Sequence, residues 1–302
     1  MALKDIKAKI KSTERTHKVT RAMEAVSAVK MRKTQGAALA DRPYARAGLS
    51  ILARLSGSGN VGRHALSEVR EVKKVGLVVI TSDKGLAGAL NSGVLKVAAQ
   101  AIEVLPVTSV SVFAYGRKAQ EYFARRGYRV VRAIDNRADD IDLPHMEELA
   151  RDLAAAFIAG EFDEVRVAYS NFKSTFEQAP TVRKLLPLSQ IAVADLVKDI
   201  VPAKGKFSET PALESPRAYT VESSHHDITD VLLPRLVAVS LYHMLLESKA
   251  SEHSARMVAM KNASDKSEEV AHDLTRTYNK IRQAAITREV SEIVGGREAL
   301  AA

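Results

Sequence analysis

The carboxyl-terminal part of the chain constrains the fold most strongly. After Pro234, neither glycine nor proline occurs before Gly295, and one helix of that span would be ~90 Å long at 1.5 Å per residue. A row of mostly small or apolar residues recurs there at alternating spacings of four and three, which is the heptad pattern of a supercoiled helix. We therefore predict a coiled-coil helix over 225–302, because a row that keeps its phase over so many turns is not typical of a solvent-exposed tail. The row comprises Leu232, Leu236, Val239, His243, Leu246, Ala250, His253, Met257, Met260, Ser264, Ser267, Ala271, Leu274, Tyr278, Ile281 and Ala285.

The amino-terminal segment 1–56 is predicted to form the partner helix. Leu3 to Gln35 contains no glycine or proline and is rich in good helix formers. Its apolar row is weak, but small residues at Ala22, Ala25 and Ala28 permit close approach of another helix. Ser56 to Asn60 has the composition of a flexible linker. Two long helices at the two ends of the chain predict an antiparallel coiled coil.

The middle of the chain alternates between short apolar runs and helical periods. Strands are expected at Val75 to Ile80, Val107 to Tyr115, Tyr128 to Ala133 and Val165 to Ser170, with helices between them, and one more strand within Lys173 to Ser189. This order predicts a mostly parallel, Rossmann-like α/β domain over 70–195, inserted between the two helices. The segment 196–222 is expected to hold an irregular excursion and a final strand, since prolines and a glycine interrupt it.

Charge is concentrated at the amino terminus. The chain carries a net charge of +9, and Met1 to Lys33 holds ten basic residues against three acidic ones. Such a stripe favours an acidic partner, which is nucleic acid, lipid headgroups or an acidic protein surface. There are no cysteines, which excludes disulfides and thiolate chemistry. No run approaches the roughly 20 apolar residues of a membrane span, so a soluble or peripheral protein is expected.

Candidate sites for chemistry are few. Gly85-Leu86-Ala87-Gly88 after a strand suggests a phosphate-binding loop, but the P-loop Lys-Ser/Thr pair is absent, and Asp83 is interpreted as a cap of the following helix. His225-His226 beside Asp227 lacks a third metal ligand in the pattern. We therefore expect no catalytic residues, no cofactor and no metal. Three classes remain: a scaffolding rod, a basic coiled-coil nucleic-acid-binding protein, and an enzyme with an oligomerising coil.

Absence of a catalytic constellation weakens the enzyme class. Nucleic-acid binding has the basic stripe in its favour, yet the first 33 residues contain no aromatic side chain that could stack on bases. A rod enclosed by acidic protein surfaces fits better.

Seven stretches of the sequence together resemble one known family. They are LKDI at 3–6, KIKS at 9–12, KVTRAME at 18–24, KMRK at 30–33, TSDKGLAGALN at 81–91, EHSARMVAMKNA at 252–263 and YNKIRQAAITRE at 278–289. The family that they resemble is the gamma subunit of F-type ATP synthases, in its bacterial form. Lys84, Ala87 and Ala89 depart from the family's usual Arg, Cys and Gly. The closing stretches, 252–263 and then 278–289, are the most specific of them.

The resemblance implies a central rotor shaft that serves ATP synthesis and hydrogen ion transport without a catalytic site of its own. Its implied partners are the alpha and beta subunits of the catalytic hexamer, the epsilon subunit and the membrane c-subunit ring, with no nucleic acid. It also implies a peripheral protein on the cytoplasmic face of a bacterial inner membrane, and the Met1 start without a presequence agrees with a bacterial origin.

The resemblance also implies two sets of contact residues. One set would touch the hexamer, and the other would lie at the foot of the shaft, near epsilon and the ring. The hexamer set is Met23, Lys30, Arg256, Arg282, Gln283, Thr287 and Glu289, and the foot set is Asp83, Lys84, Gly85, Gly88 and Asn91.

Overall fold

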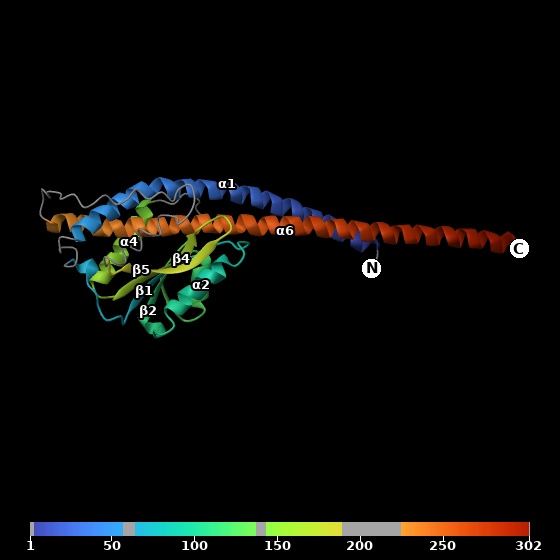
Figure 1. Cartoon of the computed structure of the whole chain (residues 1–302). Coiled ribbons are helices and arrows are strands. Elements are labelled where there is room, and N and C mark those ends of the chain that lie inside the picture. Colours follow the sequence, from blue (N-terminus) through green and yellow to red (C-terminus); the bar gives the residue numbers. More distant parts are fainter. Residues whose placement is uncertain (1–2, 57–63, 137–142, 189–224, 302) are drawn as a thin grey trace. The chain divides into compact units, whose positions relative to one another are not determined.

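The computed structural model describes residues 3–56, 64–136, 143–188 and 225–301, with side chains in 3–37, 64–136, 144–188 and 230–297 (Figure 1). The chain divides into two compact units. One comprises Met1–Ser27 with Arg256–Ala302, and the other comprises Ala28–Ala255. The two long helices contribute to both units. In chain order the elements are α1 Leu3–Ser56, η2 Ala65–Ser67, β1 Val75–Ile80, α2 Leu90–Ala101, η3 Val107–Ser109, β2 Val110–Tyr115, α3 Arg117–Ala124, β3 Arg129–Ile134, α4 Leu143–Ile158, β4 Glu164–Phe172, β5 Gln178–Leu186 and α6 His225–Ala301.

The second unit contains a five-stranded sheet in the order β3-β2-β1-β4-β5. The first four of these strands are mutually parallel, and β5 is antiparallel to β4. All six residues of β1 are buried, which explains its continuous apolar sequence, because a central parallel strand is covered on both faces. The strand order reverses direction between β1 and β4, as in doubly wound folds.

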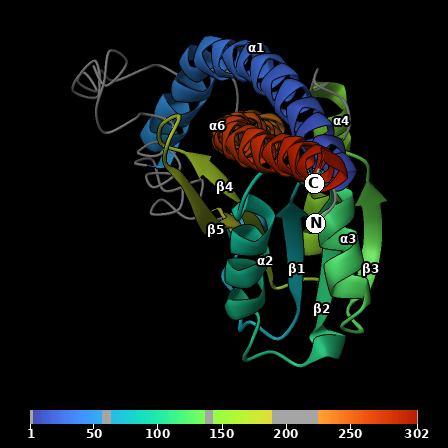
Figure 2. The same ribbon diagram turned by 90° about the vertical axis from the view of Figure 1, so that its right-hand side faces the viewer.

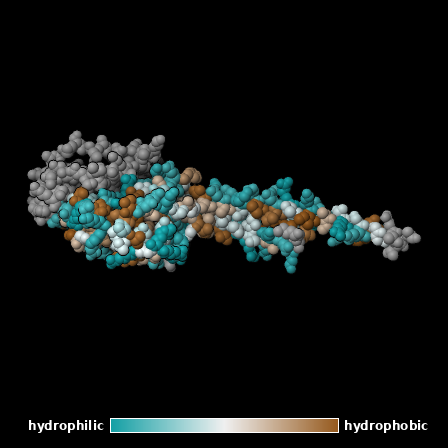
Figure 3. All heavy atoms as spheres, turned by 90° about the horizontal axis from the view of Figure 1, so that it is seen from below, coloured by the Kyte–Doolittle hydropathy of each residue, from teal (hydrophilic) through white to brown (hydrophobic). Residues whose placement is uncertain are grey.

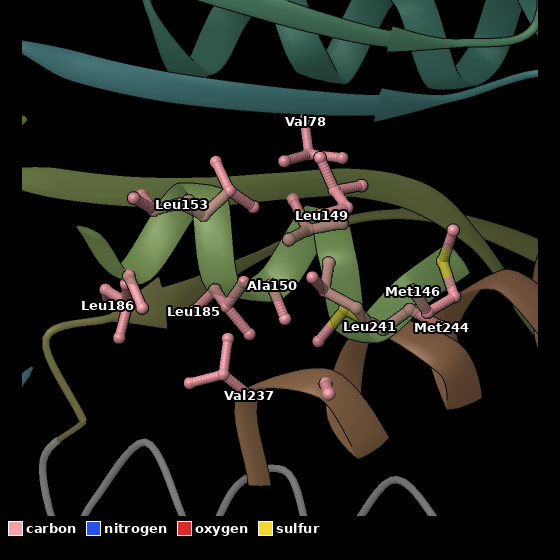
Figure 4. Packing of buried hydrophobic residues seen from close by; sticks show 14 of the residues in the cluster. Val78, Met146, Leu149, Ala150, Leu153, Leu185, Leu186, Val237, Leu241 and Met244 are labelled. Carbon is pink, nitrogen blue, oxygen red and sulfur yellow. The ribbon is translucent and has the colours of Figure 1, made fainter. Parts of the chain in front are cut away.

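Helices cover both faces of this sheet (Figure 2). Leu77 and Val79 of β1 point toward α2 and α3, in a cluster that includes Phe123. Val78 and Ile80 point to the opposite face, where α4 and the first part of α6 pack. Figure 4 shows this second cluster, in which leucines and methionines from α4, α6 and β5 interlock below β1. The labelled residues there are Val78, Met146, Leu149, Ala150, Leu153, Leu185, Leu186, Val237, Leu241 and Met244.

The expected fold class is confirmed, and several element boundaries differ from those expected. The strand at Val75–Ile80 is as predicted. The following helix begins at Leu90 rather than Leu86, because Leu86 and Gly88 have φ of +63° and +57° and turn the chain before it. The strand expected from Val107 begins at Val110, after a short 3₁₀ turn. The segment 196–222 and the linker 57–60 lie outside the described residues, so the predicted division into 1–56, 70–195, 196–222 and 225–302 stays a prediction.

The first unit is an antiparallel pair formed by the start of α1 and the second half of α6. The Nδ1 of His17 lies 3.0 Å from the carbonyl oxygen of Ser264 and 3.1 Å from its hydroxyl. With this register, α6 continues past about Tyr278 beyond the first residue of α1. Small and polar side chains occupy the seam, since Thr20 and Ser264 are both buried.

One window of α6 corrects the expectation that no stretch could span a membrane. By length and composition, an 18-residue window within Asp230–Arg297 has a mean hydropathy of 1.3, which is sufficient for a spanning helix. Polar and charged residues interrupt the apolar residues in this part of α6, so no unbroken run marks it in the sequence. In the structure 72% of this window is buried against the rest of the chain, as in the core helix of a globular domain.

Candidate functional site

The loop after β1 binds the amino terminus of α3. The Asp83 carboxylate accepts a hydrogen bond from the amide of Arg117 at 2.7 Å, and the Thr81 hydroxyl accepts one from the amide of Ala119 at 2.9 Å. The amide of Lys118 donates to the carbonyl oxygen of Ser82 at 3.4 Å. The first three amides of α3, which have no partner within the helix, are therefore all satisfied by one tripeptide.

This arrangement corrects the interpretation of Asp83 as the cap of the next helix along the chain. The helix α2 has Ala89 at its N-cap and no side-chain cap bond. Asp83 instead caps α3, which begins 34 residues later, because β1 and β2 are adjacent parallel strands whose carboxyl ends meet at one edge. Gly116 makes the close approach possible. Its φ is +105°, and a Cβ there would lie 2.1 Å from the carbonyl oxygen of Thr81.

Asn136 extends the same network to the end of β3. Its amide donates to the second carboxylate oxygen of Asp83 at 3.0 Å, and its side-chain nitrogen donates to the carbonyl oxygen of Thr81 at 2.6 Å. From α6, the Lys249 ammonium donates to the carbonyl oxygen of Asn136 at 2.7 Å. Burial and the Asp83 carboxylate together raise the pKa of Tyr115 to about 12. The carboxyl ends of three parallel strands are thus joined to each other and to α6.

Asn91 holds the other end of the loop. Its side-chain oxygen accepts from the amide of Ser82 at 3.0 Å, and its nitrogen donates to the Ser82 hydroxyl at 2.7 Å. Within the predicted foot set, Asp83 and Asn91 are therefore committed to internal bonds. Lys84, Gly85 and Gly88 are exposed and lie at the surface of the loop.

The chemistry of this edge is structural. The first amides of α3, which could bind a phosphate, already donate to acceptors of the protein itself: the Asp83 carboxylate, the Ser82 carbonyl oxygen and the Thr81 hydroxyl. Among the side chains that the structure describes, no group of three or more His, Cys, Asp or Glu residues could hold a metal ion. The side chains of His225, His226 and Asp227 lie outside that part of the chain.

A cavity of about 1030 Å³ lies on the α4 side of β2 and β3. Its walls include Phe113 and Phe162, and one of its several cations, Arg132, binds Asp152 at 2.6 Å and Glu148 at 2.9 Å. The lining includes serine and threonine but no histidine, so it offers no serine–histidine pair for nucleophilic catalysis.

The predicted hexamer set divides by burial. Arg282, Gln283, Thr287 and Glu289 are all exposed on α6, whereas Arg256 is only 8% exposed. Met23 and Lys30 on α1 are half-buried. The last turns of α6 also expose Ile286, Val290, Ile293 and Val294, so this end of the helix presents apolar as well as polar groups. Figure 3 shows apolar patches among hydrophilic ones along the surface of the paired helices.

Comparison with known proteins identifies the family. The ATP synthase family profile matches residues 2–300. The ATP synthase gamma chain of Roseiflexus castenholzii is 41% identical over 302 residues, which cover 99% of this chain and 98% of the relative. This chain belongs to the ATP synthase gamma-chain family. The gamma chain of Pelotomaculum thermopropionicum is also similar, with 38% identity over 99% of both chains.

Solved structures agree with the gamma-chain assignment. A chain from the central stalk and c-ring structure of the Tetrahymena thermophila mitochondrial ATP synthase superposes with a TM-score of 0.61 at 27% identity, covering 82% of this chain and 99% of that one. A chain from the Euglena gracilis mitochondrial ATP synthase gives a TM-score of 0.64 at 18% identity, covering 99% and 94%, which supports the fold.

The gamma-chain family is the central-stalk rotor of ATP synthase, and this chain has that role. It is part of an ATPase complex that is associated with a membrane. The comparisons give no support to the nucleic-acid-binding alternative, since the relatives and structural neighbours named above are ATP synthase subunits.

Sequence reasoning missed three residues of the network: Asn136, Gly116 and Lys249. Their partners are far away in the sequence, so no local pattern shows them. Lys249 left the clearest signal, because it is a lysine in a stretch of the heptad helix whose other residues are mostly apolar or small, apart from charged or polar neighbours such as Glu247 and Glu252.

Proposed function

We propose that the chain turns as the gamma shaft inside a hexamer of alpha and beta subunits and stands, together with epsilon, on a membrane c-subunit ring. Ion flow would turn the ring and the shaft, and the asymmetric shaft would favour a different state at each catalytic site in turn. Rotary coupling of this kind is a population shift that differential contacts impose.

The observation that carries the proposal is the second half of α6. This helix runs past the start of α1, and its exposed end carries Ile286, Val290, Ile293 and Val294. Exposed apolar residues in a row favour a protein partner. A sleeve formed by the hexamer would cover them, and the 41% identity to a gamma chain over nearly the full length supports that partner.

The contact residues belong to the proposal. Arg282, Gln283, Thr287 and Glu289 are exposed and able to reach a sleeve. Met23 and Lys30 are partly accessible. Arg256 is buried, so a hexamer residue would have to come close to the helix to contact it. For the foot, the exposed Lys84, Gly85 and Gly88 are the groups able to touch epsilon or the ring, and Asp83 and Asn91 would support their loop from within.

We place the ATP-processing sites outside this chain and the shaft at the cytoplasmic face of a bacterial inner membrane. The absence of a catalytic constellation in the sequence supports the first point, and Asp83 filling the amino terminus of α3 agrees with it.

Copurification tests the proposal. The tagged chain should be recovered with alpha, beta and epsilon, and ATP hydrolysis should accompany that complex. The chain alone should give no heat of ATP binding at micromolar concentration. Recovery of the chain with nucleic acid, or ATP hydrolysis by the chain alone, would contradict the proposal.

A further inference from the structure

Three buried polar side chains of α6 bind the α/β domain at separate places. The Lys249 ammonium donates to the carbonyl oxygen of Asn136, just after β3, at 2.7 Å. The Ser251 hydroxyl donates to the carbonyl oxygen of Ser170 in β4 at 3.1 Å. The Ser254 hydroxyl donates to the carbonyl oxygen of Thr175, between β4 and β5, at 2.6 Å. The strand order is β3-β2-β1-β4-β5, so these bonds reach the strands that lie on either side of the central pair β1 and β2.

The three donors leave opposite flanks of the helix. Val237, Leu241 and Met244 form the strip of α6 that packs on the domain core (Figure 4). At about 100° per residue, Lys249 lies on one flank of this strip, and Ser251 and Ser254 lie on the other. If α6 rotated about its own axis in either direction, the hydrogen bonds on one of the two flanks would lengthen.

The apolar strip alone does not fix the rotational angle of α6 about its own axis relative to the α/β domain. Hydrophobic contact is nondirectional, whereas a hydrogen bond weakens steeply when its distance and angle change. Lys249 is only 2% exposed, and a cation is retained at such a site only where polar groups bind it. Its partner Asn136 binds Asp83 and Thr81, which hold α3. We call Lys249, Ser251 and Ser254, with the carbonyl groups that they bind, the clamp. Through Asn136 the clamp is connected to the carboxyl ends of β1, β2 and β3.

We infer that Lys249, opposed by Ser251 and Ser254, fixes the rotational angle between α6 and the α/β domain, and so passes torque from the domain into the shaft. Lys249 is thus a positioning residue for rotary coupling. The inference rests on the proposed rotor function, since a chain that does not rotate would transmit no torque.

Single-molecule rotation tests the clamp. The absence of native cysteine allows one cysteine to be placed either at exposed Ala124 of α3 or at exposed Arg235 of α6. In the assembled complex, with the shaft stalled, a bead on each cysteine reports angular fluctuation of the domain or of the helix. We compare the native chain with Lys249→Met, which keeps the side-chain length, and with Lys96→Met, an exposed lysine of α2, as the matched control.

In Lys249→Met, the variance of the Ala124 bead should rise about twofold, because one flank has lost its hydrogen bond. The Arg235 bead should not change, and Lys96→Met should match the native chain at both positions. The combined Ser251→Ala and Ser254→Ala variant should loosen the Ala124 bead likewise, and it replaces Lys249→Met if that variant does not assemble. Unchanged fluctuation at Ala124 in both variants would overturn the clamp.

Hydrogen exchange on the isolated full chain separates failure of the clamp from failure of the rotor. Lys249→Met should speed exchange at the amides of Asn136 and Arg117, while amides of α2 keep their native rates. Native exchange at Asn136 and Arg117 would contradict the clamp even if the complex rotates. A native complex that does not rotate would instead refute the proposed function.

Discussion

The two halves of α6 have the same helical period but different surroundings. Between Leu236 and Ser254 every residue but Tyr242 is buried, and even lysine, glutamate and serine are inside. From Lys261 onward most residues are exposed, including the apolar Val290 and Ile293. A heptad row therefore predicts that a helix has a partner without predicting which partner covers it. The first half packs on the α/β domain of its own chain, whereas the second half pairs with the start of α1 and is exposed beyond about Tyr278.

Proline at Ser264 should have the largest effect, because it breaks the less covered half. It removes a helical hydrogen bond and clashes with the preceding turn, at a cost of about 3 kcal/mol or more. ATP-driven proton pumping by the reconstituted complex should fall sharply. Ser264→Ala, which loses only the hydroxyl near His17, serves as the control. Unchanged pumping and rotation with the proline would refute a continuous shaft.

Gly116→Ala tests the hydrogen-bond network at the carboxyl ends of β1, β2 and β3, to which the buried first half of α6 is bound. The new Cβ would lie 2.1 Å from the carbonyl oxygen of Thr81, a backbone atom, so the ends of β1 and β2 must separate. We expect a loss of unfolding free energy of about 3 kcal/mol in urea titration, typical of strain at a special backbone position. Gly127→Ala is the matched control, since its φ is +78° but nothing lies within 4 Å. Equal losses in the two variants would show that the backbone angle, rather than the close contact, limits the site.

Asp83→Asn removes the carboxylate that serves both α3 and Asn136. An amide has one acceptor oxygen, so one of the bonds from Arg117 and Asn136 must be lost. We expect destabilisation by about 1.5 to 3 kcal/mol, the usual range for bonds to a charged group. Urea unfolding of the variant beside Glu121→Gln, a control at the surface of α3, measures the effect. If the two variants were equally stable, Asp83 would not be the main cap of α3.

Arg282→Glu should leave the stability of the isolated chain within about 0.5 kcal/mol, because the residue is exposed on the less covered half. In the complex it should reduce torque more than assembly, since a charge-assisted bond to the hexamer would be lost. Single-molecule rotation measures torque directly. Native torque and rate would reduce the residue to a solvated position.

Asp163 gives the smallest expected effect, which depends on pH. Burial alone would raise its pKa, but hydrogen bonds from the amides of Lys74 and Lys73, at 2.7 and 2.9 Å, lower it below its ordinary value. The carboxylate therefore stabilises the fold above its unfolded pKa, and this contribution is lost as the pH falls through the lower folded value. The stability difference between native chain and Asp163→Asn should be present at neutral pH and vanish in acid. A difference that persists in acid would point to packing.

Local patterns in the sequence were sufficient to predict where the main helices and strands lie, although not all of their ends. The six apolar residues of β1 and the glycine-free span of α6 mark their elements without reference to the rest of the chain. The antiparallel direction of β5 was not predicted, since the pattern that marks a strand carries no sign of its direction. The chain order of strands and helices was enough to predict the parallel part of the sheet.

The candidate site was less predictable, because its contacts are long-range. The polar triplet Thr81-Ser82-Asp83 announces a cap, but the helix that it caps is known only once β1 and β2 are paired. The bond from Lys249 to Asn136 joins residues that are 113 positions apart. The sequence shows that a buried lysine needs a partner, and only the fold shows which one.

The closed edge of the sheet has a wider consequence. In open α/β sheets the crevice at the carboxyl ends, where the strand order reverses, is the usual place for a ligand. Here that edge meets α6, with Asn136 after β3 and Ser170 in β4 bound by the helix on either side of β1 and β2. The edge of the sheet that binds small molecules in other proteins here attaches the α/β domain to the shaft helix of the same chain.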